Sequence, residues 1–148
     1  MFIKSPIFEN NGNIPKEYSC DGSGLRPELQ IGAVPIEAKS LAIIMHDPDA
    51  PMDGGFTHWM VWNIDPKTSL IKSDDELRNC VQGLNSAKKI GYIAPCPRNG
   101  AHHYVFYLFA LNSLIDLKED ASFFALDQEI KNKLISKTEL VGIYDRKI

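Results

Sequence analysis

The sequence predicts a mainly β fold, a β-sandwich of two antiparallel sheets with one late α-helix. Three observations lead to this prediction. The apolar segments are short and rich in strand-forming residues, proline and glycine interrupt the chain throughout, and only one segment has helical spacing. The 148 residues are 44% hydrophobic, which is enough for one sizeable core. We therefore expect residues 1–148 to form a single domain.

The predicted strands differ in strength. The strongest is 103–111 (HYVFYLFAL), which is apolar at nearly every position and therefore predicts a central strand covered on both faces. A second clear strand, 40–47 (SLAIIMHD), runs into an unusual polar stretch. The remaining predicted strands are 58–64, 89–95 and 139–145, of which the last two are weaker.

Residues 122–137 (SFFALDQEIKNKLISK) predict the helix. Its apolar side chains share one stripe: Phe123, Leu126, Ile130 and Leu134. Asp120 or Ser122 can cap the first turn, because a side-chain oxygen accepts a bond from a free backbone N–H there. Lysines crowd the other end, as the helix dipole favours. We expect this helix to be a packing element.

Composition argues against several classes of function. A net charge of −3 and a pI near 5.8 disfavour non-specific binding to nucleic acid. The N-terminus does not resemble a signal peptide, and no run approaches the ~18 apolar residues that span a bilayer. The odd number of cysteines (Cys20, Cys80 and Cys96) favours unpaired thiols in a reducing compartment. We therefore expect a soluble, cytoplasmic protein.

The chemistry-bearing residues concentrate in two segments, 46–59 (HDPDAPMDGGFTHW) and 94–104 (APCPRNGAHHY), which hold all four histidines. Side chains alternate between the faces of a strand, so neighbouring histidines point in opposite directions. One consistent assignment of these side chains to strand faces gathers four of them at a single mouth of the sandwich: Asp47, His58, His102 and Tyr104. His46 and His103 then face elsewhere, and alternation places His58 on the same face as Met60 and Trp62.

The motifs resemble a known family. DPDAP (47–51), HW (58–59) and APCPRNGAHHYVFYLFAL (94–111) together look like the phosphatidylethanolamine-binding protein family, particularly its short bacterial branch of Raf kinase inhibitor-like proteins. Further similarity at 20–35 and 139–144 extends the resemblance over nearly the whole chain. It implies a phosphatidylethanolamine-binding-protein-like fold with a small pocket that binds anions such as phosphate or a phospholipid head group.

The resemblance also implies the residues of that pocket. They are Asp47, Asp49, His58, Pro97, Gly100, His102 and Tyr104. The chain departs from the family pattern at His103, which stands where the family commonly has arginine, at Ile31 in place of tryptophan, and at Pro27-Glu28 in place of two prolines. The family often has a cis peptide at the position before Pro51. Its short bacterial members are often homodimers, and the analogy extends to a kinase or other signalling partner.

An aspartate in an anion pocket makes chemical sense if it orients a histidine. We expect Asp47 to accept a hydrogen bond from a histidine ring and to favour its protonated form. His58 and His102 would then supply positive charge, and Tyr104 a hydroxyl donor. Asp49 either contacts the ligand or only braces the loop.

Three classes of function remain open from the residues. The first, which we favour, is a binding module for a small anion with no cofactor and no bound metal. The second is an enzyme: a metal-dependent one using His58, His102 and Asp47 as two histidines and one carboxylate, or a Cys96–His102 hydrolase. The third is a protein-interaction module whose pocket no longer binds anything.

Overall fold

The computed structural model describes residues 1–146. Strands and helices follow the chain in this order: β1 (Phe2–Lys4), β2 (Gly12–Asn13), the 3-10 turn η1 (Lys16–Tyr18), β3 (Leu29–Gly32), β4 (Ser40–Asp47), β5 (Phe56–Ile64), β6 (Leu70–Ile71), β7 (Val81–Gln82), β8 (Ala101–Leu111), α1 (Phe123–Lys133) and β9 (Leu134–Asp145). The mainly β prediction with one late helix is confirmed.

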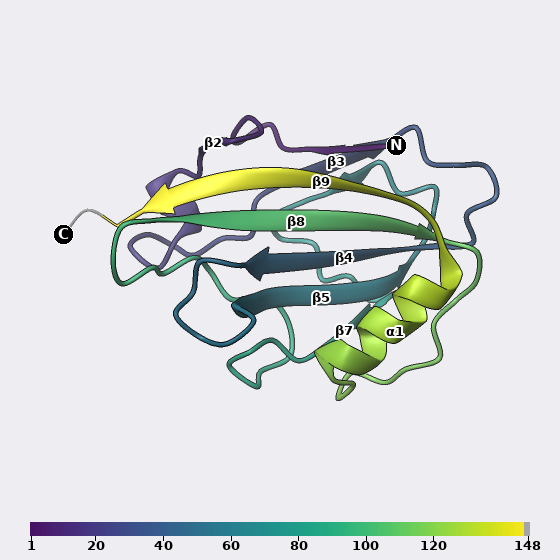
Figure 1. Ribbon diagram of the computed structural model, residues 1–148. Helices are drawn as coiled ribbons and strands as arrows, with labels where there is room; N and C mark the ends of the chain where they lie inside the picture. The colour runs from purple at the N-terminus through teal and green to yellow at the C-terminus, as the bar shows by residue number, and fades with distance from the viewer. Residues whose placement is uncertain (147–148) are drawn as a thin grey trace.

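The strands form two sheets (Figure 1). A small sheet has the order β1-β3-β6, and a large sheet has the order β2-β9-β8-β4-β5-β7. All pairings are antiparallel except that of β2 with β9, which is parallel and departs from the all-antiparallel expectation. β8 pairs with β9 over its whole length and with β4 from Val105 to Leu111, so it is a central strand, as its apolar sequence predicted.

The core has two parts, one on each face of the large sheet. Between the sheets, side chains of β4 and β8 such as Met45 and Phe106 pack against Ile31 and Ile71 of the small sheet. On the outer face, alternate residues of the same strands pack against α1. Burial on both faces explains why 103–111 lacks the polar alternation of a surface strand.

α1 is shorter than its predicted range of 122–137. Ser122 is the N-cap, its Oγ accepting a bond from the Ala125 N–H at 3.0 Å, and the helix ends at Lys133. Leu126 and Ile130 are buried against the sheet, whereas Phe123 and Leu134 remain about 45% exposed. Residue 134 already begins β9, so the last part of the expected helix is strand.

Three further expectations are wrong. Residues 89–95 form no strand and contribute only an isolated bridge between Leu84 and Ile90. Cys20 and Cys96 form a disulfide across 76 residues of sequence, so only Cys80 is a free thiol. Within residues 1–146 every peptide bond is trans, including the one before Pro51.

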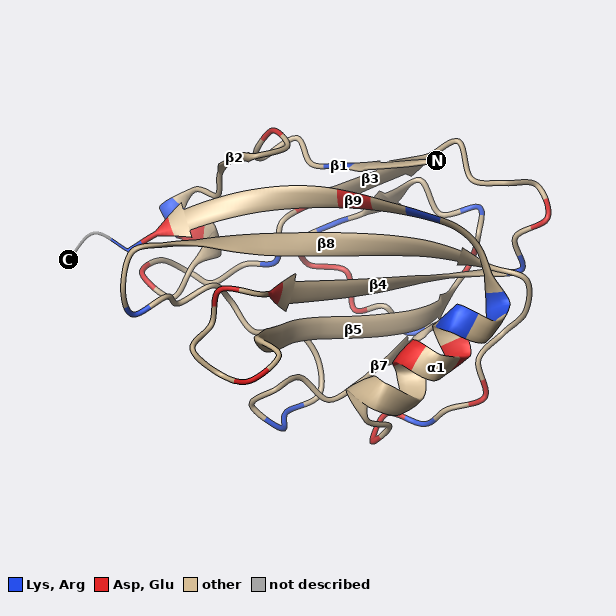
Figure 2. Ribbon diagram, in the orientation of Figure 1, with Lys and Arg blue, Asp and Glu red and all other residues tan. Residues whose placement is uncertain are grey.

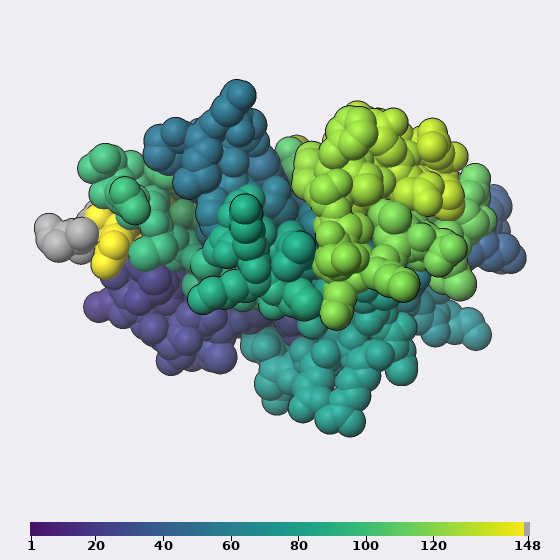
Figure 3. Space-filling view, turned by 90° about the horizontal axis from the view of Figure 1, so that it is seen from below, coloured from purple at the N-terminus to yellow at the C-terminus, as the bar shows by residue number. Residues whose placement is uncertain are grey.

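Charged residues lie mainly on α1 and in the loops, while the strands are largely uncharged (Figure 2). Seen from below in Figure 3, α1 packs at one side of the molecule and the segment between β4 and β5 projects at the other. No helix in the described part of the chain is long and apolar enough to cross a bilayer.

Candidate functional site

The predicted site residues meet at one end of the large sheet. β4 ends there at Asp47, β5 and β8 begin there at Phe56 and Ala101, and β9 ends there at Asp145 (Figure 1). Antiparallel pairing places these strand ends side by side. The loops carrying DPDAP and PRNG therefore converge at one mouth of the sandwich.

His58 reaches this mouth because of a β-bulge. Met45 lies opposite Trp59, but the next residue of β4, His46, lies opposite Thr57, so His58 is an extra residue on β5. Such a bulge turns a side chain that plain alternation would place on the other face. The ring of His58 lies 5.2 Å from that of Tyr104 on the inner face, whereas Met60 and Trp62 pack beneath α1. The expectation that these three residues share a face is therefore wrong.

Asp47 and His102 form a buried pair. His102 Nδ1 lies 2.7 Å from Asp47 Oδ2, and the side chains are 11% and 4% exposed. The other carboxylate oxygen accepts the backbone N–H of Asp49 at 2.8 Å, which fixes the start of the DPDAP loop. A carboxylate oxygen can only accept here, so Nδ1 of His102 carries the proton and Nε2 is left for another partner.

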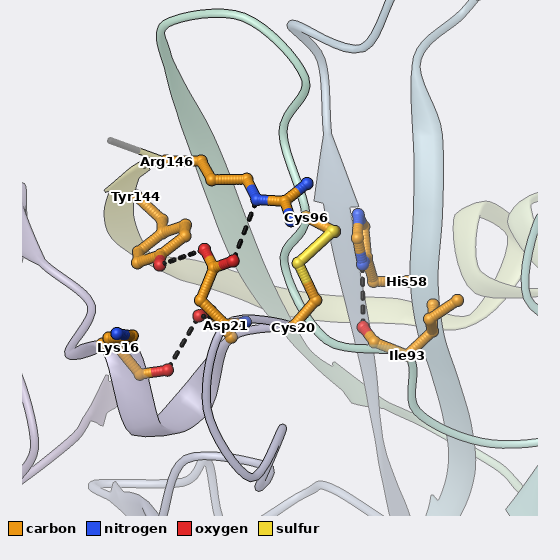
Figure 4. Close-up of a disulfide and its surroundings, with 9 residues drawn as sticks. Lys16, Cys20, Asp21, His58, Ile93, Cys96, Tyr144 and Arg146 are labelled. Atoms are coloured by element: carbon orange, nitrogen blue, oxygen red, sulfur yellow. Dashed lines mark hydrogen bonds and ion pairs between the residues drawn. A yellow bond between two sulfur atoms is a disulfide. The ribbon is translucent and has the colours of Figure 1, made fainter. Parts of the chain in front are cut away.

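His58 is held in the same manner by a different group. Its Nδ1 donates to the carbonyl of Ile93 at 2.8 Å, again leaving Nε2 (Figure 4). Burial lowers the pKa of His58 below the ordinary 6.5, although the bond to Ile93 and the charge of Asp47 act in the opposite direction. The ring is therefore mainly neutral at neutral pH in the unliganded protein.

Tyr104 completes the inner surface. It is fully buried, and its hydroxyl makes no hydrogen bond to residues 1–146. The backbone of Cys96 lies near enough to lower its pKa slightly, but burial and then the Asp47 charge dominate and raise it. The hydroxyl thus stays protonated and can donate to a ligand, and an unpaired buried hydroxyl is otherwise costly.

Asp49 lies at the rim and faces away from this cluster. Its Oδ2 accepts both the backbone N–H and the Nδ1–H of His103, each at 2.7 Å. Both side chains are exposed to solvent, at 39% and 51%. The pair ties the DPDAP loop to the start of β8, which is the bracing role considered for Asp49.

The remaining predicted residues lie in the loop before β8. Pro97 is buried, and Gly100 is exposed with a φ of +70°, a conformation that favours glycine. His46 faces outward as alternation predicts: its ring contacts Thr57 and stacks on Phe123 of α1. Nothing in the sequence alone assigned the two residues that close the rim, Asp21 and Arg146.

The disulfide places Asp21 at the rim of the mouth. Cys20 bonds to Cys96 in the loop before β8, and the Cys20 N–H also donates to the Pro95 carbonyl. Asp21, the next residue, accepts the Tyr144 hydroxyl at 2.7 Å and the Arg146 Nε–H at 2.9 Å (Figure 4). These bonds lower the pKa of Asp21, that from Tyr144 most strongly. The only sequence signal for this arrangement is the pairing of Cys20 with Cys96, and the odd cysteine count predicts unpaired thiols instead.

The metal site and the Cys96–His102 pair considered from the sequence are not assembled in residues 1–146. Asp47 contacts the Nδ1 atom of His102, so it orients that ring and does not stand beside Nε2 as a third metal ligand. Within residues 1–146, no group of three or more histidine, cysteine and acidic side chains is placed to hold a metal ion. Cys96 is oxidised in the disulfide and has no thiolate to act as a nucleophile.

Fold and site together define a class: a two-sheet β-sandwich whose strand ends gather a buried Asp–His pair, a second histidine and a tyrosine. The chain belongs to the phosphatidylethanolamine-binding protein family, whose model matches residues 4–145. It is 42% identical to a UPF0098 protein of Pyrococcus horikoshii, over 97% of this chain and 76% of that protein. A Chlamydia trachomatis UPF0098 protein is 39% identical over 99% of both chains.

Solved structures give the same result. The chain resembles the crystal structure of a putative phosphatidylethanolamine-binding protein homolog from Chlamydia trachomatis, with a TM-score of 0.94 and 38% identity over 98% of this chain and 97% of that one. It also resembles E. coli YbcL, described as a new member of the mammalian family, with a TM-score of 0.90 and 26% identity over 98% of both chains. The expected family and fold are therefore confirmed, and the Chlamydia relatives agree with a bacterial branch.

Proposed function

We propose that the mouth formed by Asp47, His58, His102 and Tyr104 binds a small phosphate-like anion, such as free phosphate or the head group of a phospholipid. One observation carries this proposal: both histidines use Nδ1 on protein acceptors, so that neither Nε2 atom has a hydrogen-bond partner within residues 1–146. The Tyr104 hydroxyl, whose ring lies 5.2 Å from that of His58, is likewise unpaired there. On protonation each Nε2 becomes a donor with positive charge.

The arrangement suits an anion better than a cation. Asp47, the one buried carboxylate of the cluster, has both oxygens engaged, one by His102 and one by the Asp49 N–H. The groups left over are the hydroxyl and the two imidazole edges, which together can donate three hydrogen bonds to an oxyanion. Pro97 and Gly100 serve in this proposal as wall residues, and Asp49 braces the loop.

The test is calorimetric titration with inorganic phosphate and with phosphoethanolamine. We expect both to bind the wild type, and His102→Ala to weaken both by tenfold or more, roughly one lost charge-assisted hydrogen bond. Lys4→Ala, on the small sheet, is the matched control and should bind as the wild type does. If neither anion binds, the mouth is not an anion site and the interaction-module alternative gains support.

The family analogy supports two further proposals about partners. We propose that the protein modulates a kinase or another signalling partner, and that two copies associate as a homodimer over apolar surface near the mouth. Met52, in the loop beside the DPDAP motif, is 51% exposed and would be covered by such a dimer. Light scattering at tens of micromolar should then give twice the 16.6 kDa of one chain.

We also propose a cytoplasmic location, but the disulfide is evidence against it. The expectation of a reducing compartment depends on three unpaired cysteines, whereas Cys20 and Cys96 are bonded. Disulfides persist mainly in oxidising compartments. Fractionation of the source cells with an antibody to this protein tests the location directly.

A further inference from the structure

The rim of the mouth holds a cation, Arg146, that is not among the seven predicted pocket residues. β8 and β9 pair so that His102 lies opposite Tyr144, and their side chains share the inner face. Arg146 follows Tyr144 by two residues, and both side chains reach the same carboxylate, that of Asp21. The Arg146 side chain therefore lies on the same face as that of Tyr144, beyond His102 and nearer to solvent.

Arg146 is fixed at one edge and free at the other. Its Nε–H donates to Asp21 Oδ1 at 2.9 Å, and the terminal nitrogens make no hydrogen bond to any residue in 1–146. In Figure 4 the guanidinium end extends from Asp21 to the side on which the Cys20–Cys96 bridge is drawn. The side chain is 32% exposed, so an incoming solute can reach it.

Three restraints hold this guanidinium in place. The disulfide anchors Cys20 to the loop before β8, Asp21 follows directly, and the Tyr144 hydroxyl holds the second oxygen of the same carboxylate. A guanidinium oriented in this way presents its two terminal NH2 groups as a preformed fork, which suits two oxygens of one phosphate.

We propose that Arg146, oriented by Asp21, is a further anion-binding residue that makes the site prefer a phosphomonoester to a phosphodiester. The inference rests on the proposed function. A diester offers these donors two terminal oxygens and one negative charge. A monoester offers three terminal oxygens and up to two negative charges, so it makes stronger charge-assisted bonds to the histidine edges, the Tyr104 hydroxyl and the arginine fork.

The experiment compares two ligands by calorimetry: O-phosphoethanolamine as the monoester and glycerophosphoethanolamine as the diester of an intact head group. We expect the wild type to bind the monoester more tightly, by about tenfold for one charge-assisted contact. Arg146→Ala should lose this preference mainly by weakening the monoester. Arg146→Lys, which keeps the charge without the fork, should retain part of the affinity and little of the preference.

Arg78→Ala is the matched control, since Arg78 is also exposed and paired with a neighbouring carboxylate, that of Glu76, but lies outside the mouth. Thermal melting of each variant checks the fold. An Arg146→Ala protein that keeps both the affinity and the preference overturns the inference while leaving the anion site intact. A wild type that binds neither ligand overturns the proposed function and this inference together, and equal binding of both ligands by the wild type overturns the inference alone.

Discussion

The position of the His58 ring at this site depends on one β-bulge. The bulge places its ring on the inner face beside Tyr104, although regular alternation from Met60 would place it beneath α1. Its Nδ1 is then held by the Ile93 carbonyl and its pKa is lowered by burial. A neutral, oriented imidazole suits the proposed anion site, because it can take up a proton when an anion binds.

The lowered pKa of His58 predicts how anion binding depends on pH. The free ring is mostly neutral above its lowered pKa, and a bound sulfate favours the protonated ring, so binding takes up a proton and raises that pKa. Sulfate affinity should therefore be highest at low pH and fall as pH rises through the bound-state value. Calorimetry between about pH 5.5 and 8, around the ordinary histidine value of about 6.5, measures this.

His58→Gln supplies the control for that measurement, because an amide can donate a hydrogen bond but does not titrate in this range. Its sulfate affinity should vary less with pH than that of the wild type. Sulfate is fully ionised throughout, so the ligand adds no titration of its own. Affinity that rises with pH would contradict the charged-histidine mechanism and favour a metal site, whose ligands must lose protons.

Asp47 and Asp49 are separated by one residue and should respond differently to the same change. Asp47→Asn leaves either the His102 Nδ1–H or the Asp49 N–H facing the amide NH2 group, which cannot accept, so the free energy of unfolding should fall by about 1–3 kcal/mol. Asp49→Asn alters a half-exposed pair and should cost no more than about 1 kcal/mol. Urea denaturation of both variants checks this. Equal losses of unfolding free energy would mean that the buried Asp47–His102 pair stabilises the fold no more than the exposed Asp49–His103 pair does.

At the scale of elements, regular patterns in the sequence were predictive and local exceptions were not. The apolar run at 103–111 identified β8, and alternation placed His102 with Tyr104 and away from His103. The bulge at His58 depends on pairing with β4, which no local pattern encodes. Residues 89–95 carry strand-forming side chains but, apart from the Ile90 bridge, cross the mouth as a loop whose carbonyls bond to His58 and Cys20.

The disulfide joins two such loops, and its removal predicts a change in stability. A bond across 76 residues restricts the unfolded chain, so Cys20→Ser with Cys96→Ser should lower the free energy of unfolding by about 2–4 kcal/mol. Thermal melting with and without a dithiol reductant measures the loss. Cys80→Ser is the control: it should melt like the wild type and lose as much on reduction. Three reactive thiols in denatured, unreduced wild type would show that the bond does not form.

At the scale of the whole molecule, the mouth draws its parts from distant regions of the chain. β4, β5 and β8 supply the inner side chains, and Arg146, which directly follows β9, closes the rim through Asp21. These groups meet only when both sheets and the disulfide loop are in place. A ligand that needs all of them binds the folded chain and not the unfolded one, and so it must stabilise the fold.

This linkage predicts a rise in melting temperature with phosphate. At about 100 times its dissociation constant, phosphate should add about 2.7 kcal/mol, which for a domain of this size raises the melting temperature by about 5–10 °C. Excluded anions stabilise most proteins without a site, so His102→Ala must be melted at the same phosphate concentrations. The wild-type shift should follow a saturable binding curve, whereas the variant should show only a weak, linear rise. Identical rises in both proteins would mean that phosphate acts by exclusion from the surface and that His102 holds no anion.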